Sequence, residues 1–188
     1  TGYNNTFRYF EYYFKKKPAI LIKSRTSVEI LETDNDKQSL RLLAKDIFTY
    51  FGLGCRNVSK LFMPIGFDLK KLIHSFYEFE EIKLHHKYSN NLNYYKTIKI
   101  LNNEKFIDGK FFLMSESKRF TPPISEIYYE FYENKKELIK YLKTKSENLQ
   151  CIVSNSICKN HVNFGDTQNP KLFDYADNID TLEFLLTN

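Results

Sequence analysis

The order of elements is clearest in residues 40–63, LRLLAKDIFTYFGLGCRNVSKLFM. Apolar side chains recur there at the i, i+3, i+4 and i+7 spacing of a helix with one buried face, and Asp34 or Asp36 precedes them as a candidate N-cap. We expect this buried stripe to run as far as Phe51, with Gly52 ending the helix. The apolar run after the glycines predicts a strand.

Similar patterns occur along the rest of the chain. Helices are predicted over residues 4–14, 68–79 and 134–142. Strands are predicted over residues 19–22, 28–31, 58–63, 111–114, 127–131 and 151–153, and near the end of the chain over 182–186. Residues 88–103 fit neither pattern. Strands that alternate with helices predict an α/β layer fold with a largely parallel sheet.

Composition excludes several classes of protein. The 188 residues are 42% apolar and include 17 Phe and 14 Tyr, which is not the composition of a disordered chain. The 28 basic and 23 acidic residues give a net charge of +5, and the lysines are spread along the chain. A nucleic-acid binder would carry a denser basic stripe, so we expect no nucleic-acid partner. No apolar run approaches the length of a transmembrane helix, and we expect no secretory leader.

The three cysteines form no CxxC pair, which argues against a disulfide framework and a zinc site and predicts no bound metal. Reduced thiols fit a cytoplasmic protein. Cys55 stands between Gly54 and Arg56, just after the predicted helix, where a bound substrate could reach a thiol without meeting a bulky neighbour. It is a candidate nucleophile; the alternative is a small buried apolar residue.

Residues 46–62, which contain this cysteine, closely resemble the nucleophile segment of the acyl-CoA reductases, the LuxC-like branch of the aldehyde dehydrogenase superfamily. Further segments match the family in the same order. They are Thr1–Thr6, which resembles a glycine turn beside the nicotinamide cofactor, then Arg25–Val28, Pro123–Ser125, Gln150–Ser154, Phe164–Pro170 and Asp174–Thr181.

The resemblance implies a three-layer aldehyde dehydrogenase-like catalytic domain with a mostly parallel sheet, preceded by a remnant of the cofactor domain. Residues 1–24 would be that remnant and 25–163 the catalytic domain. Residues 164–188 would be a C-terminal tail that returns to the cofactor domain or adds an oligomerisation strand. By this reading the chain is the carboxy-terminal part of a reductase and is inactive in isolation.

The implied chemistry runs through a thioacyl-enzyme. Cys55 would take the acyl group from a long-chain acyl-CoA, and NADPH, with NADH as the alternative, would reduce it to an aldehyde. Ile22 falls where related hydrolytic enzymes have a general-base glutamate. The residues that would support the nucleophile loop are Gly52, Gly54, Arg56 and Asn57. Those that would contact the cofactor are Gly2, Phe164 and Gly165.

The expected partners are acyl-CoA or another acyl thioester and, as a candidate, an acyl transferase or ligase. The full-length protein is expected to be a homo-oligomer. A second hypothesis stays open: a non-catalytic assembly or binding domain that retains the aldehyde dehydrogenase-like fold.

Overall fold

The computed structural model describes residues 4–21, 24–155, 161–175 and 179–187. The chain divides into two compact units. The first comprises Thr1–Arg25 and Asn169–Asn188, and its helices are α1 (Asn4–Phe14) and α6 (Thr181–Thr187). The second unit, Thr26–Gln168, contains the sheet and Cys55.

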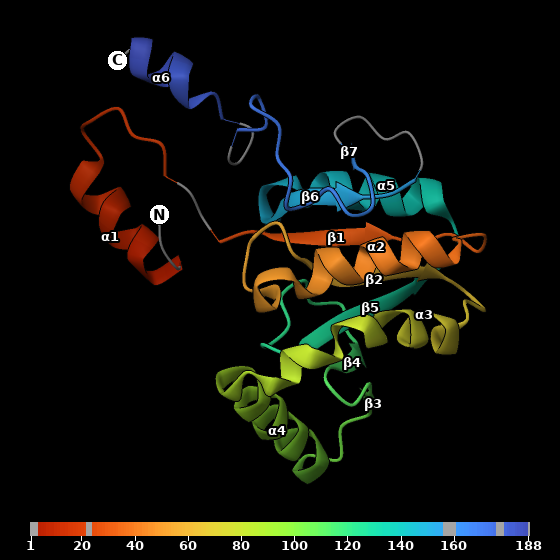
Figure 1. The fold of residues 1–188 in the computed structure, drawn as a ribbon. Helices are drawn as coiled ribbons and strands as arrows, with labels where there is room; N and C mark the ends of the chain where they lie inside the picture. The colour runs from red at the N-terminus through yellow and green to blue at the C-terminus, as the bar shows by residue number, and fades with distance from the viewer. Residues whose placement is uncertain (1–3, 22–23, 156–160, 176–178, 188) are drawn as a thin grey trace. The chain divides into compact units, whose positions relative to one another are not determined.

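The second unit is built on a mixed sheet that is mostly parallel (Figure 1). Within the described residues it has seven strands in the order β3-β4-β5-β2-β1-β6-β7, and only β3 runs antiparallel to its neighbour. The strands are β1 (Thr26–Ile30), β2 (Val58–Pro64), β3 (Ile107–Asp108), β4 (Leu113–Glu116), β5 (Glu126–Tyr132), β6 (Leu149–Val153) and β7 (His161–Val162). The predicted fold class is therefore confirmed.

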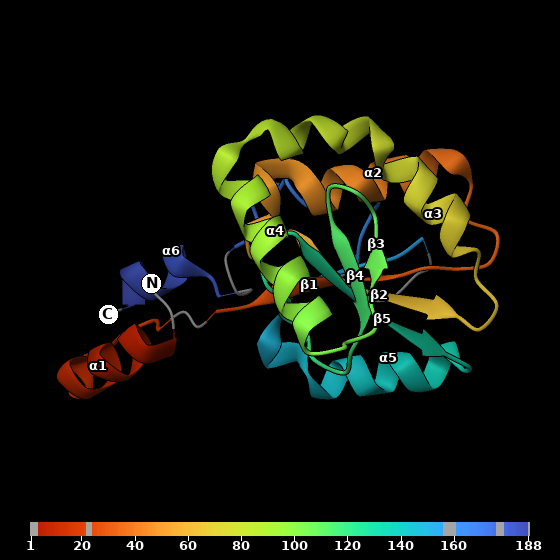
Figure 2. The same cartoon turned by 90° about the horizontal axis from the view of Figure 1, so that it is seen from below.

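Helices cover both faces of the sheet, as Figure 2 shows. One face is covered by α2 (Lys37–Phe48) and α3 (Leu69–Phe76), and the other by α5 (Lys135–Thr144). The remaining elements are the short 3₁₀ segments η1 (Thr49–Gly52), η2 (Tyr77–Leu84) and η3 (Ser146–Asn148), and the helix α4 (His86–Leu101). Because α2 connects the neighbouring parallel strands β1 and β2, the chain returns at the amino-terminal edge of the sheet just before β2.

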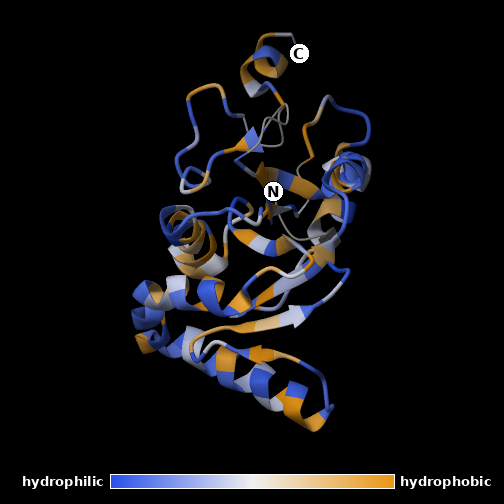
Figure 3. Cartoon of the chain, turned by 90° about the vertical axis from the view of Figure 1, so that its right-hand side faces the viewer, coloured by the Kyte–Doolittle hydropathy of each residue, from blue (hydrophilic) through white to orange (hydrophobic). Residues whose placement is uncertain are grey.

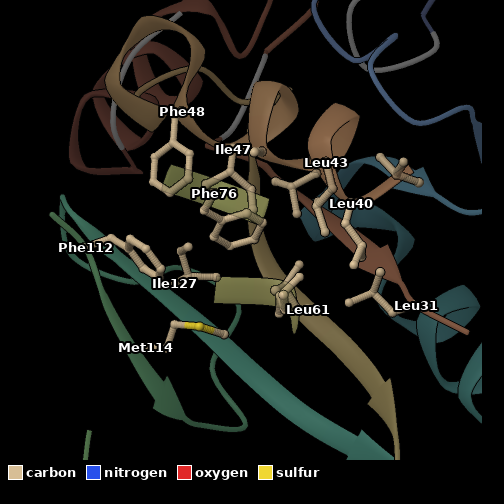
Figure 4. Close-up of a cluster of buried hydrophobic side chains, with 14 of the residues drawn as sticks. Leu31, Leu40, Leu43, Ile47, Phe48, Leu61, Phe76, Phe112, Met114 and Ile127 are labelled. Atoms are coloured by element: carbon tan, nitrogen blue, oxygen red, sulfur yellow. The ribbon is translucent and has the colours of Figure 1, made fainter. Parts of the chain in front are cut away.

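The larger hydrophobic core lies between the sheet and the α2 and α3 face (Figure 4). The ring of Phe48 lies 5.5 Å from that of Phe76 and 5.2 Å from that of Phe111, measured between centroids. A smaller core joins α5 to the opposite face of β1, β2 and β6 through residues such as Leu142 and Phe62. In Figure 3 hydrophobic colouring is concentrated on the strands, and the helices alternate between hydrophilic and hydrophobic residues.

Side-chain caps fix where three helices begin. Asp36 accepts a hydrogen bond from the Ser39 N–H at 2.7 Å, and Asp68 accepts one from the Lys70 N–H at 2.9 Å. Asn134 caps α5 in the same way. The sequence left Asp34 and Asp36 open as the cap of α2, and the structure selects Asp36. The other two helices begin where they were predicted, directly after residues 68 and 134, because a cap depends on residues within one turn of the helix start.

The structure corrects several predicted elements. Residues 19–21 form no strand, and Ile22 lies outside the described residues. Residues 181–187 form a helix where a strand was predicted for 182–186. Residues 86–101, left open by the sequence, are the helix α4. The first α-helix of the second unit ends at Phe48, so Phe51 does not continue its buried stripe and is 36% exposed. None of the described helices has the length and apolar character needed to cross a membrane.

Candidate functional site

Cys55 lies in the loop between η1 and β2, and its side chain is exposed. Since β2 is parallel to β1 and β5, the loop lies at the amino-terminal edge of the sheet. The alternative of a small buried apolar residue is therefore wrong. Within the described residues the Cys55 backbone N–H has no hydrogen-bond acceptor, which leaves it available to an oxyanion on a group bound to the sulfur.

The Asn57 side chain gives this loop its shape. Its amide NH₂ lies 2.9 Å from the Asp46 carbonyl oxygen, 2.9 Å from that of Thr49 and 3.3 Å from that of Ile47. These carbonyls lie at the carboxy-terminal end of α2, where the last C=O groups of a helix have no N–H donor within the helix itself. The Asn57 amide oxygen accepts from the Gly54 N–H at 2.8 Å. One buried side chain thus ties the helix end to the residue before the cysteine.

Glycine is needed at position 54 because the Asn57 amide approaches so closely. A Cβ atom on Gly54 would lie 2.9 Å from the Asn57 amide oxygen, a contact that real Cβ atoms do not make. Any larger residue at position 54 would push the amide away from the helix end.

The turn before Gly54 is left-handed over three residues. Tyr50 has φ 54°, Phe51 has φ 61° and Gly52 has φ 70°. The left-handed region costs a residue with a side chain about 1–2 kcal/mol, so the two aromatic residues store strain directly before the candidate nucleophile.

Asp46 holds a second loop against the first. Its carboxylate accepts from the Gly165 N–H at 2.6 Å, the Thr167 N–H at 3.2 Å and the Thr167 hydroxyl at 2.7 Å. In return, the Thr167 carbonyl accepts a hydrogen bond from Nε of Arg56. Burial raises the pKa of the Asp46 carboxyl, although the hydrogen bonds from Gly165 and Thr167 act in the opposite direction. The loop at 165–167 therefore holds the side chain of Arg56, the residue that follows Cys55 in the sequence.

Ser27 joins the cysteine loop to β6. Its hydroxyl donates to the Cys55 carbonyl at 2.9 Å and accepts from the Cys151 N–H at 3.1 Å. Cys151 is buried, and burial raises the pKa of its thiol. The two described thiols therefore differ in kind, because Cys55 is open to solvent and Cys151 is enclosed.

Strand β1 also carries a buried carboxyl group, that of Glu29. Val28 and Ile30 contact the α5 side of the sheet, so alternation along β1 directs Glu29 toward α2. Glu29 is 0% exposed, and neither of its carboxyl oxygens has a hydrogen-bond partner among the described residues. Burial, and then the charge of Asp46, raise the pKa of Glu29 well above its usual value.

The residues predicted to support the nucleophile are brought together. Gly54, Arg56 and Asn57 lie in one loop with Cys55, and Gly52 ends η1 just before that loop. Asp46, Ser27 and Thr167 were missed by the sequence reasoning. One feature of the sequence could have identified Asp46: it is an acidic residue next to the apolar stripe of a predicted helix. No feature of the sequence could have identified Ser27 and Thr167, because each forms its hydrogen bonds with residues distant in sequence.

Two of the three residues predicted to contact a cofactor lie among the described residues. Gly2 lies outside the described residues, and Phe164 is buried in the larger core. Gly165 has φ 82° and its N–H is bonded to Asp46. The cofactor roles of these three residues stay predictions. No group of three or more His, Cys, Asp or Glu side chains within the described ranges could hold a metal ion.

Solved structures share this architecture. A mutant of the indole-3-acetaldehyde dehydrogenase AldA of P. syringae, in complex with NAD+ and IAA, superposes with a TM-score of 0.52 at 9% identity, over 84% of this chain and 39% of that chain. The Delta-pyrroline-5-carboxylate dehydrogenase of Mycobacterium tuberculosis, bound with NAD, gives 0.52 at 13% identity, over 84% and 36%. The fold is aldehyde dehydrogenase-like.

The chain thus spans 39% and 36% of the length of these two dehydrogenases. No model of a protein family matches it, and no curated protein matches it. At this level of identity the likeness concerns the fold, and the chemistry must be argued from the site.

Proposed function

We propose that the chain carries the acyl-accepting cysteine of an oxidoreductase that converts acyl thioesters, with long-chain acyl-CoA as the expected substrate, to aldehydes. The exposure of Cys55 in a loop braced by Asn57, Ser27 and Arg56, on an aldehyde dehydrogenase-like fold, is the observation that supports this proposal. A nucleophile must be reachable and held in one position, and this loop meets both needs.

The first step is an acyl transfer. The Cys55 thiolate attacks the thioester carbonyl, a carbon–sulfur bond forms to Cys55, and coenzyme A leaves as a thiolate with the electron pair of the broken bond. The negative charge that develops on the carbonyl oxygen can be met by the Cys55 backbone N–H. Because Ser27 and Asn57 bond to the peptide groups on either side, that N–H is held in place before the substrate arrives.

The second step needs a hydride. A reduced nicotinamide, NADPH or NADH, would supply it and turn the thioacyl group into an aldehyde and a free Cys55 thiol. The resemblance of the sequence to the acyl-CoA reductases supports this half. Acyl-CoA or another acyl thioester as donor, an acyl transferase or ligase as its source, and a homo-oligomer of the full-length protein belong to the same proposal.

The acyl transfer needs no hydride, so it can be tested on the chain itself, although the chain in isolation is expected not to form the aldehyde. The protein is incubated with decanoyl-CoA, and the intact mass and a peptide map are measured with and without hydroxylamine, which cleaves thioesters. We expect one decanoyl group on Cys55, none in Cys55→Ser, and an unchanged adduct in Cys151→Ser. A folded protein that takes no acyl group at Cys55 would refute the proposal.

A second function is favoured by the surroundings of two predicted cofactor residues: Phe164 is buried in the larger core, and the Gly165 N–H donates to Asp46. In that case the domain would act as a non-catalytic assembly or binding module. Such a module should leave Cys55 no more reactive toward decanoyl-CoA than a free cysteine in an unfolded peptide. A Cys55 acylation rate far above that of the peptide would exclude it.

A further inference from the structure

The outer face of the helix α4 carries no charged side chain over most of its length. Figure 1 shows this helix at the margin of the second unit. Its inner face is defined by Tyr88, Leu92 and Lys99, which are buried. Because a helix turns once in about 3.6 residues, the residues opposite to these can be assigned from their positions. Six exposed residues make up this outer face: Asn90, Asn93, Tyr94, Thr97, Ile100 and Leu101.

A helix face that meets only water normally carries charged side chains, and this face does not. Three of its residues are large and apolar or aromatic: Tyr94 is 59% exposed, Ile100 56% and Leu101 74%. The two lysines of the same stretch are paired elsewhere, since Lys96 lies 2.5 Å from a carboxylate of β3 and Lys99 lies 2.9 Å from one of β5. Exposed apolar side chains that are neighbours on an uncharged surface indicate a contact with another protein surface.

The spacing along this face indicates which surface covers it. One stripe of side chains recurs at successive intervals of three, four, three, four and three residues: Lys87, Asn90, Tyr94, Thr97, Leu101 and Glu104. This is the spacing of the seam between two paired helices. The intervals are the same when they are read from either end, so a second copy of α4 that runs antiparallel presents a matching stripe. Tyr94 of one copy then lies opposite Thr97 of the other.

The charges at the two ends of the stripe match in the same arrangement. Lys87 is exposed at the start of α4, and the side chain of Glu104, just past its end, is 48% exposed. In an antiparallel pair Lys87 of each copy lies opposite Glu104 of the other, and twofold symmetry forms this contact twice. A parallel pair would instead place lysine beside lysine. Two chains of net charge +5 repel each other, so an uncharged face is where they can approach closely.

We infer that the outer face of α4 is the contact surface between two copies of this chain, paired antiparallel about a twofold axis. This contact gives a surface to the homo-oligomer in the proposed function; it rests on that function for the expectation of an oligomer alone, and it assumes nothing about acyl transfer. One helix face covers less area than a standard interface, so the dissociation constant should be of the order of 10 μM.

Sedimentation equilibrium of the whole chain, from about 1 to 200 μM, measures this association. We expect a monomer–dimer equilibrium. Tyr94→Lys brings two like charges to the centre of the contact and should raise the dissociation constant at least about tenfold. Leu101→Ser should raise it in the same direction. The matched control is Ile65→Lys, which adds the same charge at an apolar residue that is 63% exposed and lies outside α4. Its dissociation constant should equal that of the parent protein.

A charge exchange tests the antiparallel arrangement. Lys87→Glu places two carboxylates opposite each other at both ends and should raise the dissociation constant about fivefold. The double variant Lys87→Glu with Glu104→Lys restores opposite charges and should return to within about twofold of the parent.

A parent protein that stays monomeric over the whole range would overturn the inference, and so would a dimer that Tyr94→Lys does not weaken. A double variant that dimerises no better than Lys87→Glu would overturn the antiparallel pairing. Acylation of Cys55 by decanoyl-CoA is measured on the same samples. Since Cys55 is not on α4, these failures can be told apart from a failure of the proposed acyl transfer.

Discussion

Replacement of Glu29 by glutamine should stabilise this protein, and by more at higher pH. Glu29 lies in the inner strand β1, is 0% exposed, and has no hydrogen-bond partner for either carboxyl oxygen among the described residues. Burial and the neighbouring Asp46 carboxyl raise its pKa in the folded protein. Glutamine has nearly the same shape and never ionises, so the variant removes the titration and keeps the volume.

The magnitude follows from proton linkage. In the unfolded chain the Glu29 carboxyl ionises near pH 4.3, about the value for a free glutamate. Between that pH and its raised pKa, the folded protein keeps a proton that the unfolded chain has released, so the stability of the parent falls as pH rises. The loss is about 1.4 kcal/mol for each pH unit across this window. The advantage of Glu29→Gln should grow at the same rate and level off at the folded-state pKa.

Urea denaturation from pH 4 to pH 8 measures this difference. At the acid end both side chains are neutral and the two proteins should agree to within about 1 kcal/mol. Val28→Ala on the opposite face of the same strand is the control, since its cost should be the same at every pH. A difference between Glu29→Gln and the parent that does not change with pH would refute the reasoning. So would a glutamine variant that is less stable than the parent at neutral pH.

Three further changes test other parts of the structure. Asn57→Ala leaves the carbonyls at the end of α2 without their donor and should cost about 2–4 kcal/mol in urea denaturation; a loss under about 1 kcal/mol would contradict the role of the amide. Lys60 is 0% exposed, and its Nζ lies 2.6 Å from a carboxylate oxygen of Glu130, whose side chain is 31% exposed. Glu130→Gln, which leaves a buried charge unpaired, should therefore cost about 3 kcal/mol and more than Lys60→Met, and the reverse order would contradict this account. Tyr50→Gly relieves a left-handed tyrosine and should raise the stability by about 1 kcal/mol in a thermal melt, whereas a lowered midpoint would show that the ring packs in the folded state.

Local features of this protein could be predicted from the sequence. The caps Asp36, Asp68 and Asn134 begin helices as expected, because a cap and the N–H groups that it accepts from lie within one turn. The buried face of α2 was predicted from the helical spacing of its apolar side chains, and the strand after the glycines from its apolar run. Both signals lie within a single segment of the sequence.

Other elements could not be assigned in this way. The helix α4 has its apolar side chains distributed around its axis and so shows no clear periodic face. The short apolar segment at 182–186 fits a strand as well as the helix that it forms, because a run of this length does not separate the two periods. The end of α2 at Phe48 also could not be assigned. The side-chain amide of Asn57, which lies beyond the turn, donates hydrogen bonds to the carbonyls at the end of this helix.

For the candidate site, the sequence by itself determined which residue could react, because a cysteine between a glycine and an arginine after a helix is a local pattern. Only the tertiary structure decided what holds that residue. Asp46 reaches Gly165 and Thr167, and Ser27 reaches Cys151, across more than a hundred residues of sequence. Such hydrogen bonds have no periodic signature, since they arise only when folding brings distant backbone groups within about 3 Å of a buried side chain.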